Sequence, residues 1–347
     1  MVDVLERFKM EGMEMNYISP INEPQWDWEA NASGFASQEG TAATNQESLA
    51  LIKELDKSLV NKGVTTKIAY GEAAQLSFLS GNVSWLSDRT DVFNYFWNKS
   101  SSGYIGNLNR VEKVVSGHSY FSQPDVPTLV NNRKNLQSRM AAVNNEVSFW
   151  QSEYCILSGE DGIQGGGRDL GIQTALYIAR IMHHDLALAN ASSWQWWLGV
   201  SPSDYKDGLV YVADPSGNMG ELQTTKTDGI ILKSKMLWAM GNYSRFIRPG
   251  MRRVEARIDG STDPLVAASS LMISAYKNAT AKEVVIVAIN MTNDNKKIKM
   301  NGLTIPGGKY KTYTTTNQKE LQFSETSSTE KITLEPKSIT TFVGTYQ

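Results

Sequence analysis

The sequence has little cysteine, no excess of charge of either sign and no long apolar run. Its single cysteine, Cys155, can form neither an internal disulfide nor a thiolate metal cluster. The chain carries 34 lysine and arginine residues against 36 aspartate and glutamate residues, so no basic surface for nucleic acid is expected. No stretch of about 18 apolar residues is present, so no membrane-spanning helix is expected. The length of 347 residues allows one large domain and a smaller one.

The first residues also lack the basic and apolar regions of a signal peptide, because Met1 leads directly into a helical pattern. We therefore expect either a cytoplasmic chain or a piece of a longer protein whose export signal lies elsewhere.

Tryptophan is missing from the last third of the chain, since all nine tryptophans lie between Trp26 and Trp238. Near Gly250 the pattern changes from helical segments alternating with apolar runs to β-rich runs separated by polar turns. These runs are 271–276, 283–290, 309–315, 331–334 and 339–343. We predict an α/β catalytic region at residues 1–248 and a β-sandwich at residues 249–347.

The first region repeats a strand and helix rhythm. A capping box at Thr44 and Glu47 and a terminal Gly63 predict one helix, and a second helix is expected from Ile172 to about Ala189. Strands are expected at 13–21, 65–70, 111–116, 147–151 and 191–196. Strands that alternate with helices imply a parallel sheet, either open or closed into a barrel.

Polar or aromatic side chains lie at the C-terminal ends of all five expected strands: Glu23, Glu72, His118, Glu153 and Trp196. The active site of a (β/α)8 barrel lies at the carboxyl ends of its strands. A barrel with no catalytic role would not need these residue types at this edge, so the pattern predicts one common site.

Glu23 lies in Asn22-Glu23-Pro24, where the proline stops the strand and holds the glutamate at the rim. Asn22 could bind a sugar hydroxyl. Trp26 and Trp28 follow on the same loop and could stack on sugar rings, whose C–H groups are apolar. A solvated turn carboxylate and a core role for one tryptophan are the alternatives.

Glu153 ends an apolar strand, and Tyr154 is expected to hold or neighbour it. Glycoside hydrolysis requires two carboxylates, one protonated and one ionised, which Glu23 and Glu153 could supply. The alternative for Glu153 is a non-catalytic carboxylate.

Four further residues are candidates for substrate binding. His118 and Tyr120 lie in one segment, where His118 could orient a carboxylate or bind a hydroxyl. Glu72 could hydrogen-bond His118 or the substrate. Strand alternation places Trp196 on the same side as Trp194, so Trp196 could form the floor of a sugar site. A structural role is the alternative for His118, Glu72 and Trp196.

The chain resembles glycoside hydrolase family 30, and most closely its endo-β-1,6-galactanase-like branch. The resemblance is carried by Ile18-Ser19-Pro20-Ile21-Asn22-Glu23-Pro24-Gln25-Trp26-Asp27-Trp28, by Gln38-Glu39-Gly40 and by Trp150-Gln151-Ser152-Glu153-Tyr154-Cys155. It implies a (β/α)8 barrel of the TIM-barrel type with a side β-sandwich, and hydrolysis of β-glycosides with retention. Glu23 matches the acid/base after the fourth strand, and Glu153 matches the nucleophile after the seventh.

The resemblance also implies that strands one to three are absent and that strands four to eight are present, so we expect an incomplete barrel. We expect a truncated product of a longer enzyme that is secreted, periplasmic or at the cell surface. Neither a metal nor an organic cofactor is expected.

Three functions remain open from the sequence. The first is hydrolysis of β-1,6-linked galactan through a covalent intermediate on Glu153. The second is the same chemistry on another β-glycan, namely β-1,6-glucan, xylan or a glucosyl lipid. The third is carbohydrate binding without catalysis, in which a polysaccharide or oligosaccharide is a ligand and not a substrate.

Overall fold

The computed structural model describes residues 1–347 except 36–39, 158–162, 221 and 260–262. Gln38 and Glu39 of the motif quoted above lie outside the described residues. None of the helices that the structure describes is long and apolar enough to cross a membrane. The chain forms two compact units, interleaved along the sequence. Unit 1 comprises Met1–Gln123, Asn131–Tyr154 and Leu188–Trp196, and unit 2 comprises Pro124–Val130, Cys155–Ala187 and Trp197–Gln347. The division near residue 248 stays a prediction.

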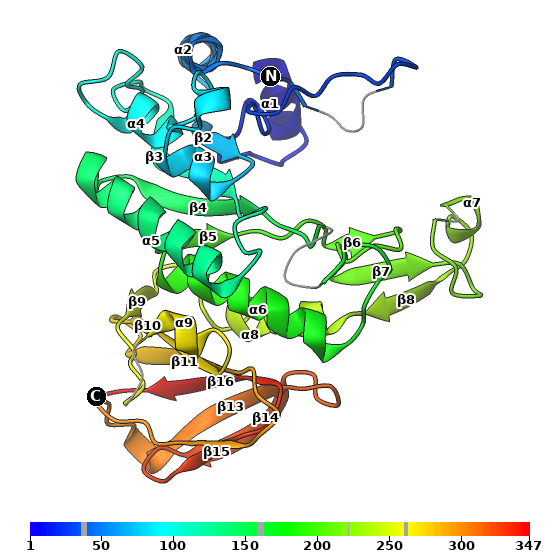
Figure 1. The fold of residues 1–347 in the computed structure, drawn as a ribbon, viewed down its shortest axis with the longest axis vertical. Helices are drawn as coiled ribbons and strands as arrows, with labels where there is room; N and C mark the ends of the chain where they lie inside the picture. The colour runs from blue at the N-terminus through cyan, green and yellow to red at the C-terminus, as the bar shows by residue number, and fades with distance from the viewer. Residues whose placement is uncertain (36–39, 158–162, 221, 260–262) are drawn as a thin grey trace. The chain divides into compact units, whose positions relative to one another are not determined.

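Unit 1 is built on a five-stranded parallel sheet in the order β1-β2-β3-β4-β5 (Figure 1). The strands are β1 (Tyr17–Ile18), β2 (Lys67–Ala73), β3 (Val111–His118), β4 (Ser148–Glu153) and β5 (Ala191–Trp194). Each strand pairs in parallel with the next one along the chain. All five predicted strands are present. β1 is shorter than predicted, because only Tyr17 and Ile18 are in register with β2.

One helix, α1 (Val2–Met10), precedes β1. The helical elements between the strands of this unit are α2 (Asn45–Asn61), α3 (Leu76–Ser80), the 3-10 turn η1 (Ser84–Leu86), α4 (Val92–Trp97) and the second part of α5 (Val126–Val143). The predicted capping box is confirmed, since the Glu47 N–H donates to Thr44 Oγ1 at 3.1 Å and the Thr44 N–H donates to Glu47 Oε2 at 2.8 Å. Gly63 follows α2 with a φ of +65°, as expected for a helix end.

The C-terminal part of unit 2 holds a six-stranded antiparallel sheet in the order β14-β13-β16-β11-β10-β9 and a two-stranded sheet β12-β15. Buried side chains of both sheets, among them Ile286, Phe342 and Leu334, form one apolar core. The strands are β9 (Arg252–Val254), β10 (Leu271–Asn278), β11 (Glu283–Asn290), β12 (Lys296–Ile298), β13 (Lys309–Thr315), β14 (Gln322–Ser327), β15 (Ile332–Leu334) and β16 (Ser338–Thr345).

The six-stranded sheet also contacts α6 (Ile172–Ala187) and α8 (Lys235–Ser244). Unit 2 contains a further three-stranded sheet that the sequence did not predict, formed by β6 (Val200–Ser201), β7 (Val210–Ala213) and β8 (Ile230–Lys233). The short elements α7 (Leu222–Thr225), α9 (Pro264–Ala267) and η2 (Pro306–Gly308) complete the described structure.

Candidate active site

The backbone of Glu23 is held in an unusual conformation just after β1. Its φ of +43° lies in the left-handed region, which a side chain other than glycine rarely adopts. Its N–H donates to the Glu72 carbonyl at 2.9 Å, and its own carbonyl accepts from the indole N–H of Trp28 at 2.9 Å. These bonds fix the direction of the glutamate. Backbone strain that the surrounding contacts hold in place is typical of functional sites.

A close approach of β2 and β3 positions Glu72. A Cβ on Gly71 would lie 2.0 Å from the Ser116 carbonyl oxygen, and Gly71 has a φ of +150°, so this position requires glycine. The Glu72 N–H then donates to Ser116 Oγ at 3.1 Å. Glu72, with a φ of +38°, therefore lies in an irregularity of β2, between the paired residues Tyr70 and Ala73.

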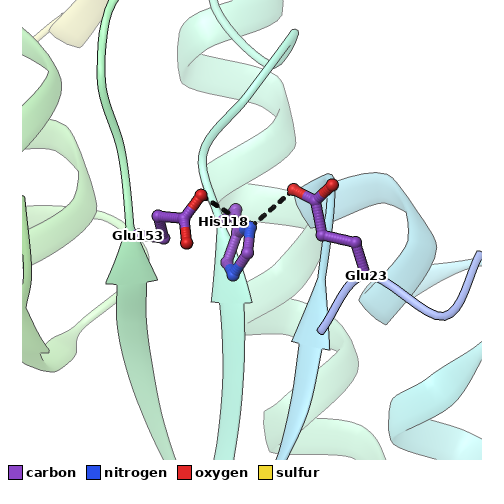
Figure 2. Close-up of side chains that lie close together, drawn as sticks. All are labelled: Glu23, His118 and Glu153. Atoms are coloured by element: carbon purple, nitrogen blue, oxygen red, sulfur yellow. Dashed lines mark hydrogen bonds and ion pairs between the residues drawn. The ribbon is translucent and has the colours of Figure 1, made fainter. Parts of the chain in front are cut away.

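His118 joins the carboxylates of three strand ends. Its ring is fully buried, with Nδ1 at 2.7 Å from Glu23 Oε1 and Nε2 at 3.0 Å from Glu72 Oε2. Ser152 Oγ also donates to Glu72 Oε2 at 2.7 Å. Figure 2 shows His118 between Glu153 and Glu23, with His118 and Glu153 at the ends of neighbouring strands and Glu23 on a loop. The predicted contact between Glu72 and His118 is thus confirmed.

This arrangement favours a protonated imidazole. Burial by itself would lower the pKa of His118, but the hydrogen bonds to Glu23 and Glu72 and the negative charges of Glu72 and Glu153 raise it to about 10. Burial would likewise raise the pKa of Glu72, yet the hydrogen bond and the charge of His118 lower it. At neutral pH, His118 is therefore a cation among carboxylates.

Glu153 is the most exposed of the three glutamates, with 23% of its side chain accessible. Tyr120 Oη donates to Glu153 Oε1 at 3.0 Å, and His118 Nδ1 lies 3.8 Å from the same oxygen. Burial raises the pKa of Glu153, while the charge of His118 and the bond from Tyr120 oppose this rise. One carboxylate oxygen of Glu23, one of Glu153 and one ring nitrogen of His118 all lie within 4.8 Å of one another.

In spacing alone, Glu23, His118 and Glu153 could surround a cation. A metal ligand histidine must offer a free lone pair, however, and a ring protonated at both nitrogens has none. Both ring nitrogens of His118 face carboxylate oxygens, Nδ1 that of Glu23 and Nε2 that of Glu72, so neither nitrogen is free to bind a metal while these contacts are made.

An aromatic cluster lies beyond the Glu153 side of the sheet. The rings of Trp194 and Trp196 stack at 6.2 Å and 18°, which confirms that they share a side. Tyr154 is fully buried and contacts both Trp196 and Tyr120, with ring centroids 6.0 and 5.5 Å away. Its Oη accepts a hydrogen bond from Gln123 at 2.8 Å.

The two tryptophans after Glu23 differ in their surroundings. The Trp28 ring packs on the backbone of Gly40, where a Cβ would lie 2.6 Å from the ring. Trp26 lies edge-on to Phe78 at 5.5 Å and next to the Trp85 ring at 6.4 Å. Asn22 precedes Glu23 and is half-buried.

Sequence reasoning missed the two serines that complete the network. Ser116 binds the Glu72 backbone and Ser152 binds its carboxylate. Both serines lie within two residues of a strand end that carries a candidate site residue, Ser116 before His118 and Ser152 before Glu153. That position could have suggested them.

The chain is similar to known glycoside hydrolases. Over 119 residues it is 31% identical to glucuronoxylanase XynC of Bacillus subtilis, a match that covers 34% of this chain and 21% of that protein. The matched segment thus spans about a fifth of the curated relative's length.

Solved structures match almost the whole chain. A conserved exported protein from Bacteroides fragilis has 33% identity and a TM-score of 0.87, over 99% of this chain and 67% of that one. A family 30 endoxylanase from Clostridium papyrosolvens has 19% identity and a TM-score of 0.63, over 98% of this chain and 68% of that one. The predicted fold class, α/β of the TIM-barrel type with C-terminal antiparallel sheets, is confirmed.

The family model described as O-glycosyl hydrolase family 30 matches residues 1–211, which include every residue of the site described above. The chain belongs to O-glycosyl hydrolase family 30.

Proposed function

We propose that this chain hydrolyses β-glycosidic bonds with retention of anomeric configuration, with Glu23 as the acid/base and Glu153 as the nucleophile. The observation that carries the proposal is the separation of the carboxylates, whose nearest oxygens lie within 4.8 Å. Retaining enzymes hold their two carboxyl groups about 5–5.5 Å apart, whereas inverting enzymes need about 6.5–9.5 Å to admit a water.

The reaction would proceed in two steps. Glu153 attacks the anomeric carbon and displaces the glycosidic oxygen, which takes a proton from Glu23. The carboxylate of Glu23 then removes a proton from water, whose oxygen attacks the same carbon and releases Glu153. Two displacements at one carbon restore the original β configuration.

His118, Glu72 and Tyr120 would act as positioning residues. A protonated His118 can donate to Glu23 and Glu72 at the same time, which holds Glu23 at its working distance. The Tyr120 hydroxyl donates to Glu153 and favours the ionised form that a nucleophile requires. The predicted direct contacts of Glu72, His118 and Tyr120 with substrate remain part of the proposal.

The substrate would be a β-linked polysaccharide or oligosaccharide. Asn22 would bind a hydroxyl group, and the rings of Trp26, Trp28 and Trp196 would contact sugar faces, with Tyr154 supporting Trp196 from the buried side. The sequence motifs favour β-1,6-galactan, whereas the curated relative is a glucuronoxylanase, which favours a β-xylan. Because one relative is an exported protein, we also propose action outside the cell.

The test is a panel of β-1,6-galactan, glucuronoxylan and β-1,6-glucan, with reducing ends measured and the first product's anomer followed by proton NMR. We expect release of a β-anomer by the wild type and loss of turnover in Glu153→Gln. Glu54→Gln on the exposed face of α2 is the matched control. Equal product release by the wild type and Glu153→Gln would refute the assignment of the nucleophile.

A further inference from the structure

Trp85 is a large exposed aromatic side chain whose ring lies beside that of Trp26, three residues after Glu23 in the sequence. It lies in η1, which follows β2 and α3, and it is 68% accessible to solvent. Single exposed apolar residues are common on proteins, but Trp85 is not isolated. Its ring lies 6.4 Å from that of Trp26 at an angle of 32°, and Trp26 in turn packs on Phe78.

The turn that carries Trp85 is firmly held. Leu86 beside it is buried, and the Leu86 carbonyl accepts from Thr90 Oγ1 at 2.9 Å. The same hydroxyl accepts from the Val83 N–H at 3.0 Å. The indole is therefore presented to solvent by a rigid turn, which reduces the entropy lost when a ligand stacks on it.

The same turn is attached to the loop that carries Glu23. Arg89 donates to the Asp27 carboxylate at 2.7 Å, and Gln25 Nε2 donates to the Arg89 carbonyl at 3.2 Å. The Trp26 N–H donates to the Glu23 carbonyl at 3.2 Å. Trp85 is thus linked to Glu23 through a short series of contacts within unit 1.

The order of the sheet decides which part of a substrate Trp85 could contact. Glu23 follows β1 and Glu153 ends β4, so the Trp26 and Trp85 pair lies on the Glu23 flank. Trp194, which ends β5, and Trp196, which follows it, lie on the Glu153 flank. An acid/base donates its proton to the leaving group, so sugars on its flank belong to the leaving side of the glycan.

We propose that Trp85, with Trp26, forms a binding site for the leaving-group side of a β-glycan chain, remote from the bond that is cleaved. This proposal rests on the proposed function, because it takes Glu23 as the acid/base. Sugar rings stack on flat aromatic faces through their C–H groups, and Trp85 offers such a face. The site would favour polymers over short substrates, because only a glycan with several sugar units on its leaving side can contact Trp85.

The experiment compares a polymer with a short substrate of the same sugar. The polymer is whichever of glucuronoxylan or β-1,6-galactan the wild type hydrolyses, and the short substrate is the aryl β-glycoside of a disaccharide, whose leaving group is too small to reach Trp85. For Trp85→Ala, we expect KM on the polymer to rise about 3- to 10-fold with kcat little changed, as for the loss of one aromatic stacking contact. The kinetics on the aryl glycoside should not change.

Trp85→Tyr should restore most of the affinity, and Phe323→Ala, which removes another exposed aromatic side chain, is the matched control. Equal effects of Trp85→Ala on both substrates, or no effect on either, would overturn the proposal while the proposed hydrolysis stood. Sedimentation that showed a wild-type dimer lost in Trp85→Ala would also overturn it, because a second copy would then cover the ring.

Binding is measured separately by calorimetry in a Glu153→Gln background with hexasaccharides of the two glycans. One outcome is that the wild type hydrolyses neither glycan but binds a hexasaccharide, and that Trp85→Ala weakens this binding. That result would support the binding site and refute the proposed function. If the hexasaccharides do not bind and neither glycan is hydrolysed, both proposals are overturned.

Discussion

The Glu72→Gln substitution removes one of the two carboxylates that bind the His118 ring while keeping the shape of the side chain. Glu72 Oε2 accepts from His118 Nε2 at 3.0 Å and from Ser152 Oγ at 2.7 Å. An opposite charge this close shifts a pKa by about 1–3 units, so the pKa of His118 should fall from about 10 to between about 7 and 9.

The lower pKa of His118 should be visible both in an NMR titration of the ring and in the pH dependence of activity. A neutral imidazole has only one N–H, so above its new pKa His118 can no longer donate to both partners. We expect the alkaline limb of the kcat/KM profile of Glu72→Gln to move to lower pH by the same interval as the His118 pKa. The folding stability of the wild type should also depend on the protonation of His118. The stabilisation from the protonated ring is complete below pH 6.5 and is lost as the pH rises through about 10.

The assay is carbon-detected NMR of histidine-labelled protein from about pH 5 to about pH 11, so that the range includes the expected wild-type pKa of His118. The chain has three histidines, and burial lowers the pKa of His183 to about 4, so that ring does not titrate in this range. Ser152→Ala is the control, since it removes a hydrogen bond to Glu72 but keeps the charge. A wild-type His118 that titrates near pH 6.5, or an unchanged pKa in Glu72→Gln, would refute the reasoning.

Two further predictions concern neighbouring positions. Tyr120→Phe removes the hydrogen bond to Glu153, and the loss of about 1.5–3 kcal/mol should lower kcat/KM about 10- to 150-fold; a change below about twofold would exclude this role. Gly71→Ala forces a Cβ against the Ser116 carbonyl and should cost about 3 kcal/mol or more in urea unfolding. Gly63→Ala, at a positive φ but with open space around it, should cost only about 1–2 kcal/mol, so equal losses would contradict the steric argument.

The sequence predicted elements whose signals are local. The capping box at Thr44 and the apolar face of α2 appear as expected, as do all five parallel strands, because residue spacing alone specifies them. The placement of Glu72 beside His118 also followed, since parallel strands bring their carboxyl ends to one edge.

Other features depend on contacts that spacing does not encode. The β6-β7-β8 sheet has strands of two, four and four residues, which are too short for an alternating pattern to mark them. Tyr120 donates the described hydrogen bond to the Glu153 carboxylate, whereas Tyr154 is the residue next to Glu153 in the sequence. A residue from the neighbouring strand can lie closer to a side chain than a chain neighbour that faces the other way. Trp85 was missed since it follows no predicted strand.

In the proposed mechanism, Glu153 forms a covalent bond to the sugar while Glu23 acts as acid and base. This bond can be trapped with a 2-deoxy-2-fluoro β-glycoside of a sugar that the wild type hydrolyses, followed by peptic digestion and mass spectrometry. We expect one added sugar on the peptide that contains Glu153. A label on any other residue, or first release of the α-anomer without a trapped intermediate, would contradict the mechanism.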